Sequence, residues 1–128
     1  PVINLKTVIS QIHKIKKGDS VGYNKGFIAT NNITTATLPI GHADGISRLY
    51  GNGNGKVIVN GKFAPIIGNV CMDMMMINIS KIVCKEGDQV IIFDDKNVSA
   101  DEFTKSIDTI SYEILASLSK RIKRVIIN

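Results

Sequence analysis

The sequence predicts a mainly β fold, a small β-barrel-like domain with a short C-terminal helix. Three observations support this prediction. Short apolar runs rich in β-branched residues recur along the chain, and glycine-containing turn signals separate them. The apolar spacing becomes helical only near the C-terminus. The 128 residues are enough for one domain with a single core, so we expect residues 1–128 to form one unit.

The first strands are expected in the N-terminal third. Residues 2–15 (VINLKTVISQIHKI) alternate in part between apolar and polar positions, which predicts one long strand with a bulge. A turn at Gly18-Asp19 leads into a second strand. Residues 33–40 (ITTATLPI) predict a further strand, closed by a proline.

The clearest local signal lies in residues 56–68 (KVIVNGKFAPIIG). Asn60-Gly61 joins two apolar runs there, and this pair suits a two-residue hairpin turn with positive φ at both positions. Residues 70–80 (VCMDMMMINIS) and 87–95 (GDQVIIFDD) complete the main set of strands.

Helical spacing appears only after residue 106. The apolar residues Ile107, Ile110, Ile114 and Leu118 repeat at that spacing, with Asp108 and Thr109 as candidate caps. The basic run SKRIKR (residues 119–124) reads as a solvated last helical turn, although nucleic-acid binding is an alternative. VIIN closes the chain as a short strand.

Composition limits the classes of function. Hydrophobic residues make up 44% and charged residues 21%, which is typical of a folded soluble protein. The sequence has no apolar run of 18 residues and no secretory leader, so we expect neither membrane insertion nor export. Cys71 and Cys84 match no zinc-ligand spacing, so we expect no metal site and a reducing, cytoplasmic setting.

The glycine-rich stretch LPIGHADGISRLYGNGNGK (residues 38–56) is the first candidate site. It lacks the Gly-Lys-Ser/Thr of a Walker loop, and no βαβ unit surrounds it. GNGNG reads as a flexible turn. In GHADG, Asp44 is expected to accept backbone hydrogen bonds and fix a tight loop, leaving His42 pointing outward. A purely structural role for this loop stays open.

Three further residues carry ionisable groups in unusual places. Tyr23, in VGYNKGF, lies among glycines at a strand end, and Tyr112 lies in the expected helix. Either tyrosine can simply pack its ring. Asp73 lies between methionines in an apolar segment, so its carboxylate must be hydrogen-bonded, ion-paired or at an opening. The methionines themselves are predicted to pack in the hydrophobic core.

Taken together, KKGDSVGYNKGFIA, TLPIGHADGISR, GNVCMD, TISYEIL and KRIKR resemble the C-terminal domain of alanine racemase over residues 5–124. The resemblance implies an isomerase that makes D-alanine for peptidoglycan precursors. It implies an N-terminal (β/α)₈ barrel, absent from this sequence, that binds pyridoxal 5'-phosphate. The start at Pro1 also suggests an excised domain, which we expect to be inactive alone and free of cofactor.

The resemblance also implies roles for single residues. In the family, a tyrosine from the C-terminal domain of one subunit of a homodimer acts as the acid/base at the partner subunit's cofactor, and Tyr23 matches it. Met72 matches the residue whose backbone N–H contacts the substrate carboxylate. Asp73 matches an aspartate at the mouth of the substrate route. Tyr112 matches a tyrosine that helps to hold the cofactor phosphate.

His42 and Arg48 match positions along the family's substrate corridor. His42 replaces a tyrosine, and it adds a group that titrates near neutral pH. Asn69 stands where arginine is usual, and Met74 where glutamine is frequent. Asn24 replaces a glycine, a mild change. These departures leave a serine or broad-specificity racemase open.

Two alternatives from other classes of function stay open. A basic β-barrel that binds single-stranded nucleic acid would need exposed aromatic side chains, and aromatic residues make up only 5% of this sequence. An interaction domain that supports a dimer overlaps with the racemase interpretation. For the racemase we expect a small-molecule amino-acid substrate and neither nucleic acid nor membrane as a partner.

Overall fold

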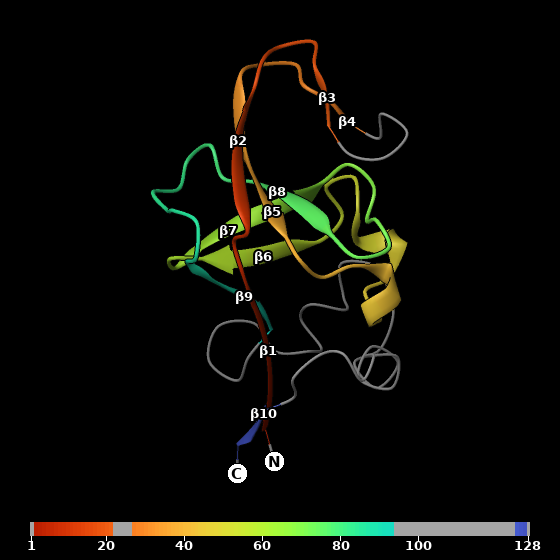
Figure 1. Cartoon of the computed structure of the whole chain (residues 1–128), viewed down its shortest axis with the longest axis vertical. Helices are drawn as coiled ribbons and strands as arrows, with labels where there is room; N and C mark the ends of the chain where they lie inside the picture. The colour runs from red at the N-terminus through yellow and green to blue at the C-terminus, as the bar shows by residue number, and fades with distance from the viewer. Residues whose placement is uncertain (1, 22–26, 94–124, 128) are drawn as a thin grey trace.

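Short antiparallel strands make up almost all of the regular structure. The computed structural model describes residues 2–21, 27–93 and 125–127 (Figure 1). Within these ranges there are ten strands and no α-helix, so the predicted mainly β fold class is confirmed. The strands are β1 (Val2–Val8), β2 (Gln11–Ile15), β3 (Ser20–Val21), β4 (Phe27–Ile28), β5 (Ile33–Leu38), β6 (Lys56–Val59), β7 (Lys62–Ile67), β8 (Met75–Asn78), β9 (Gln89–Phe93) and β10 (Val125–Ile127).

Eight strands form one curled sheet. Their order is β10-β1-β9-β6-β7-β8-β5-β2, and β3 pairs with β4 in a separate two-stranded sheet. β1 and β2 lie toward opposite ends of this order, yet only Ile9 and Ser10 connect them along the chain. The sheet therefore has to curl so that the end of β1 meets the start of β2, which gives a half-barrel (Figure 1).

The break between β1 and β2 corrects the prediction of one long strand over residues 2–15. The N–H of Ile9 donates to the loop before β9 at 3.0 Å, whereas the N–H of Ser10 donates to β5 at 2.9 Å. Residues 2–15 therefore form two strands in different parts of the curled sheet, because the chain changes its pairing partner between Ile9 and Ser10. The expected bulge is present as a register shift between Leu5 and Lys6.

The hairpin between β6 and β7 forms as predicted. Asn60 and Gly61 have φ values of +48° and +79°, and Val59 pairs with Lys62 across the turn. The Asn60 side chain also donates to the carbonyl of Val83 at 2.9 Å, which ties the turn to the loop that follows β8. The local turn signal was therefore sufficient to place this element.

Other predicted segments are shorter than expected. Gly18 occupies its turn with a φ of +92°, and β5 ends just before Pro39. In residues 70–80 only the second half is a strand, because the N–H of Cys71 donates to the carbonyl of Met74 at 2.9 Å and closes a turn. This turn separates Cys71 and its neighbours from β8.

The C-terminal part is described only in β10. Its pairing with β1 confirms the predicted short final strand. The predicted helix (residues 107–118) and the basic run (residues 119–124) lie outside the described residues, as do Tyr23 and Tyr112.

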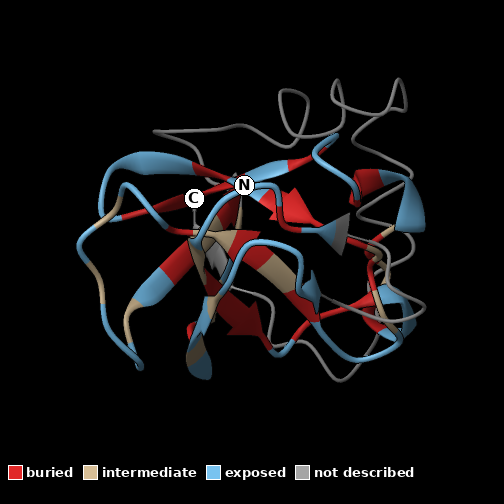
Figure 2. Cartoon of the chain, turned by 90° about the horizontal axis from the view of Figure 1, so that it is seen from above, coloured by how far each residue is buried: buried red, intermediate tan, exposed pale blue. Residues whose placement is uncertain are grey.

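The core fills the inside of the half-barrel (Figure 2). Burial alternates along most of β7, where Ala64 and Ile66 are buried and Phe63 and Pro65 are exposed. The largest fully buried side chains come from many elements: Leu5, Ile9, Leu38, Ile46, Tyr50, Ile66, Met75, Ile77, Ile92 and Phe93. Because Ile46 and Tyr50 belong to the loop between β5 and β6, this loop is anchored in the core. Among the described residues, no helix is long and apolar enough to span a membrane.

Candidate functional site

The glycine-rich stretch between β5 and β6 forms two short 3₁₀ turns followed by a glycine turn. The two turns are η2 (His42–Asp44) and η3 (Arg48–Tyr50). Gly45 ends η2 with a φ of +101°, a conformation that favours glycine. The Ser47 hydroxyl caps η3 by accepting from the N–H of Leu49 at 3.2 Å. The stretch is therefore a compact pair of turns.

Asp44 closes η2 from the inside. Its side chain is fully buried, and a carboxylate oxygen accepts a hydrogen bond from the N–H of Gly41 at 3.0 Å. The N–H of Asp44 donates in return to the carbonyl of Gly41, also at 3.0 Å. His42 lies exposed on the outside of the turn. The predicted arrangement, with the aspartate fixing the loop and His42 outward, is confirmed.

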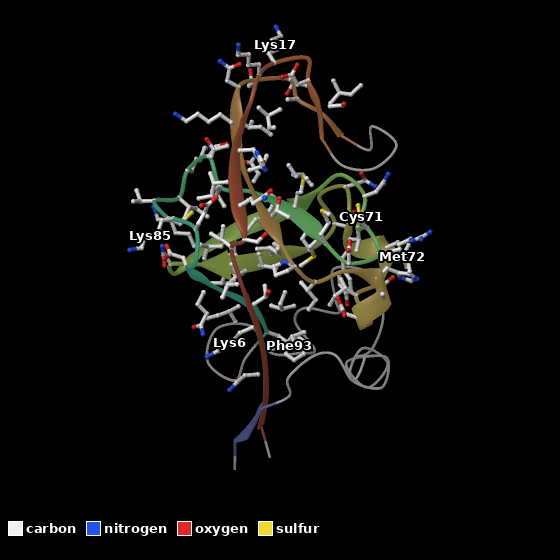
Figure 3. The ribbon with its side chains drawn as sticks, viewed as in Figure 1. Lys6, Lys17, Cys71, Met72, Lys85 and Phe93 are labelled. Atoms are coloured by element: carbon white, nitrogen blue, oxygen red, sulfur yellow. The ribbon has the colours of Figure 1, made fainter. Side chains whose placement is uncertain are left out.

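η2 is bonded to the segment Cys71–Asp73, which we call the CMD segment. The N–H of His42 donates to the carbonyl of Cys71 at 2.8 Å, and the N–H of Ala43 donates to that of Met72 at 2.7 Å. Gly41 lies so close that an added Cβ would be 2.9 Å from the nitrogen of Asp73. Two motifs about thirty residues apart in the sequence thus form one unit (Figure 3).

The glycine turn holds the chain just before the CMD segment. The N–H of Asn52 donates to the carbonyl of Gly68 at 2.8 Å, and the Asn52 amide donates to the side-chain oxygen of Asn69 at 3.2 Å. Gly51 is buried, and an added Cβ would be 2.6 Å from the Gly68 carbonyl. The predicted turn is present, and in addition its close packing requires a glycine.

The CMD segment presents side chains to solvent. Met72 and Met74 are 56% and 38% exposed, and Asp73 is exposed as well. The prediction that the methionines are core filler is therefore wrong for Met72 and Met74, although it holds for Met75, which is buried. Met72 and Met74 lie in the turn before β8 begins. The alternation of inward and outward side chains in the sheet therefore does not apply to them.

The main-chain N–H of Met72 is available for a ligand. Within the described ranges it has no hydrogen-bond acceptor, whereas the carbonyls on both sides of it are bonded to η2. Asp73, the next residue in the sequence, is exposed and lines an open depression of about 310 Å³, together with Thr37, Pro39 and Met76. A main-chain N–H can bind a carboxylate and an aspartate can bind an ammonium group, so this segment carries a partner for each charged group of an amino acid.

The structure brings together only some of the residues that the sequence singled out. His42 lies in the turn bonded to Cys71 and Met72, and Arg48 is exposed in the next turn, η3. Tyr23 lies outside the described residues, in the segment that β3 and β4 flank. The sequence reasoning missed that Gly41 packs against the CMD segment, and no local pattern carries that information.

Tyr50 also lies close to this region, in η3. Its side chain is only 1% exposed, and burial raises its pKa to about 12. The phenol therefore keeps its proton at neutral pH, and Tyr50 belongs to the buried hydrophobic core. Tyr50 is a structural residue, not a candidate for proton transfer.

The described face does not fit the anchoring of pyridoxal phosphate. Neither residues 38–55 nor residues 66–80 contain a lysine, so these two described segments offer no amine to bind the cofactor aldehyde. The Met72 N–H and the Asp73 carboxylate can instead contact the carboxylate and ammonium groups of a substrate.

The comparison with protein families identifies the chain. The model of the family "Alanine racemase, C-terminal domain" matches residues 2–126. The chain belongs to this family. The match covers nearly the whole sequence, including both the η2 turn and the CMD segment.

Individual alanine racemases show the same relationship. The chain is 42% identical over 131 residues to alanine racemase 1 of Clostridium acetobutylicum, covering 99% of this chain and 34% of the relative. The alanine racemase of Clostridium difficile 630 in complex with cycloserine superposes with a TM-score of 0.84 at 35% identity, over 98% of this chain and 35% of that one. The Bartonella henselae enzyme with covalently bound pyridoxal phosphate gives 0.85 at 33% identity, over 92% and 33%.

The chain spans about a third of the length of these relatives. The relatives that match nearly the whole chain are alanine racemases, which are isomerases. The structure and the family thus agree on a C-terminal β domain of this enzyme class.

Proposed function

We propose that this chain, residues 1–128, is the C-terminal domain of a cytoplasmic, homodimeric enzyme that interconverts L- and D-alanine. Racemisation removes the α-proton from one face of the amino acid and returns a proton to the other face. It therefore needs an acid/base group on each face. We assign one of these groups to Tyr23, acting on substrate in the partner subunit, and the other to the part of the protein that precedes this domain.

The observation that carries the proposal is the bonding of η2 to the CMD segment. The Met72 N–H has no acceptor among the described residues, and the next residue, Asp73, is exposed. A hydrogen bond from an N–H to a charged carboxylate is stronger than one between neutral groups. The Met72 N–H would bind the substrate carboxylate, and Asp73 would attract the ammonium group as the substrate arrives.

Tyr23 would hold and move the proton on one face of the α-carbon. A phenol has a pKa of about 10, so nearby positive charge has to lower it before it works as a base at neutral pH. Pyridoxal phosphate, when bound by the rest of the protein, delocalises the negative charge that develops on the α-carbon. Tyr112 would add a hydrogen bond to the cofactor phosphate.

His42 and Arg48 would border the substrate route, since both are exposed, His42 in the turn bonded to the CMD segment and Arg48 in the next turn. A serine or broader amino-acid racemase is the second candidate. One observation favours it: the Asn69 side-chain oxygen accepts from Asn52, so this amide is directed toward the glycine turn. Together with the short side chain of His42, this would leave more room along the route.

A nucleic-acid-binding role has less support. Of the aromatic side chains that the structure describes, Tyr50 and Phe93 are buried and only Phe63 is exposed. The Lys56 ammonium lies 4.2 Å from the centre of the Phe63 ring and covers it. Base stacking needs open aromatic faces, and the described aromatic side chains provide none beyond that covered ring.

The test uses the full-length protein with Tyr23→Phe, and Tyr50→Phe as the matched control. Exchange of the α-hydrogen with D₂O is measured separately on L-alanine and D-alanine. We expect Tyr23→Phe to abolish racemisation and to slow exchange from one enantiomer by about 10²–10⁴-fold, while the other keeps exchanging. Tyr50→Phe should leave both exchange rates within about twofold, because its phenol lies in the core.

Two results would contradict the proposal. Equal loss of exchange from both enantiomers in Tyr23→Phe would remove the one-face role of this tyrosine. Racemisation by the isolated 128-residue domain would show that the second acid/base and the cofactor site do not lie in the preceding part of the protein.

A further inference from the structure

We propose that Asp44 is a positioning residue for the substrate carboxylate, acting through the main chain of the CMD segment. The inference rests on the proposed function, because the group that it positions is the Met72 N–H. Asp44 itself touches neither substrate nor cofactor. It sets the shape of η2, and η2 sets the direction of the Met72 peptide.

The first step is the shape of the turn. Asp44 is fully buried, and its carboxylate accepts from the Gly41 N–H at 3.0 Å. The Asp44 N–H donates back to the Gly41 carbonyl, and the N–H of Ile46 also donates to this carbonyl, at 3.3 Å. A buried carboxylate interacts strongly with backbone donors, so it favours a single conformation of this turn.

The second step is the transfer of this shape to the CMD segment. η2 points two successive N–H groups, those of His42 and Ala43, at the carbonyls of Cys71 and Met72. These bonds fix the two peptide planes that flank the Met72 side chain. The described part of the chain contains no cis peptide, and in a trans peptide the N–H points away from the carbonyl of the same plane. The Met72 N–H is therefore directed away from η2.

The third step is the close contact at Gly41. An added Cβ there would lie 2.7 Å from the Met74 nitrogen and 2.9 Å from the Asp73 nitrogen. The Gly41 φ of −153° is ordinary extended backbone, so glycine is needed for space and not for conformation. With no gap between the two main chains, a change in η2 has to move the CMD segment as well.

The test compares full-length variants by their steady-state kinetics with L-alanine. We expect Asp44→Ala to raise KM about tenfold, with kcat within about threefold of wild type, since a mispositioned N–H weakens substrate binding. Asp44→Asn keeps a side-chain oxygen for the Gly41 N–H and should stay within about threefold of the wild-type KM. Val57→Ala, a core variant on β6, should lower stability without changing KM.

A second measurement does not depend on activity. Hydrogen–deuterium exchange without substrate should speed up at the amides of His42 and Ala43 in Asp44→Ala. The amide of Gly53, which donates to Ile66 at 2.7 Å in the glycine turn, should keep its wild-type rate. If Asp44→Ala does not fold, Gly41→Ala tests the same step, because it displaces η2 while Asp44 is intact, and it should raise KM similarly.

The inference is overturned if the folded Asp44→Ala or Gly41→Ala enzyme keeps the wild-type KM, or if Val57→Ala raises KM as much. It is also overturned if exchange at His42 and Ala43 does not change in Asp44→Ala. The proposed function fails separately, because a full-length wild-type protein that does not racemise alanine would refute it before any variant is compared.

Discussion

The main-chain N–H of Ala43 donates to the carbonyl of Met72 at 2.7 Å, between two residues that are 29 positions apart in the sequence. This bond and its neighbour from His42 join the turn after β5 to the segment before β8. β5 and β8 pair antiparallel, so the end of β5 lies beside the start of β8. Both segments are therefore at the same end of the half-barrel. The sheet therefore supplies the rigid base on which the candidate site is built.

The glycine turn that supports this site should distinguish two of its glycines. Gly51→Ala would place a Cβ 2.6 Å from the Gly68 carbonyl and should cost about 3 kcal/mol, since main chain has to move. Gly53→Ala meets open space and only has to adopt a φ near +85°, so it should cost about 1 kcal/mol. Thermal unfolding of the two variants measures the difference, and equal losses would contradict the close packing of Gly51.

Tyr50 should make the protein sensitive to alkaline pH. Burial raises its pKa to about 12, whereas the unfolded chain ionises near 10. The stabilisation is therefore complete below pH 10 and is lost as the pH rises toward 12, by at most about 1.4 kcal/mol per pH unit. Urea unfolding at pH 9 and pH 11.5 should show a smaller loss of stability in Tyr50→Phe than in wild type. An equal loss in both proteins would refute this assignment.

Much of the fold can be predicted from the sequence, because many of its signals are local. Asn60-Gly61 determines its hairpin by conformational preference alone, and Pro39 ends β5. Residues 2–15 were misread as one strand, because β propensity does not reveal where a chain changes its pairing partner. That change at Ile9 depends on how the whole sheet curls.

The candidate site could be predicted only in part, for the same reason. The turn-closing role of Asp44 follows from its place between glycines, and the structure confirms it, whereas the complete burial of its side chain was not predicted. The contact between Gly41 and the CMD segment depends on tertiary structure, and no spacing in the sequence encodes it. The exposure of Met72 and Met74 was missed, because an apolar run reads as a continuous buried strand when an internal turn is not recognised.

Cys84 should react slowly with alkylating agents. Burial raises the pKa of its thiol, and the negative charge of Asp88 raises it further. Asp88→Asn removes that charge and should roughly double the rate of reaction of Cys84 with iodoacetamide at pH 8. Cys71, the other free cysteine, serves as the control in the same sample, and its rate should not change. An unchanged Cys84 rate would show that Asp88 does not influence the thiol.

His42 should influence the size of the substrate that the enzyme accepts. It is exposed on η2, next to the CMD segment, so its side chain borders the proposed route. His42→Tyr introduces a larger ring and should lower the ratio of kcat/KM for L-serine to that for L-alanine by about threefold to tenfold. His42→Ala should raise the same ratio. A ratio that moves in the same direction in both variants would exclude a steric role for this position.

The account depends most on the claim that the Met72 N–H faces the substrate. Millisecond deuterium labelling of the full-length protein, with and without saturating alanine, tests it directly at the amides of residues 69–76. We expect alanine to slow exchange at Met72, where no acceptor within the described residues protects the amide, and to leave the already bonded Cys71 amide unchanged. Binding of alanine with no added protection at Met72 would contradict the account.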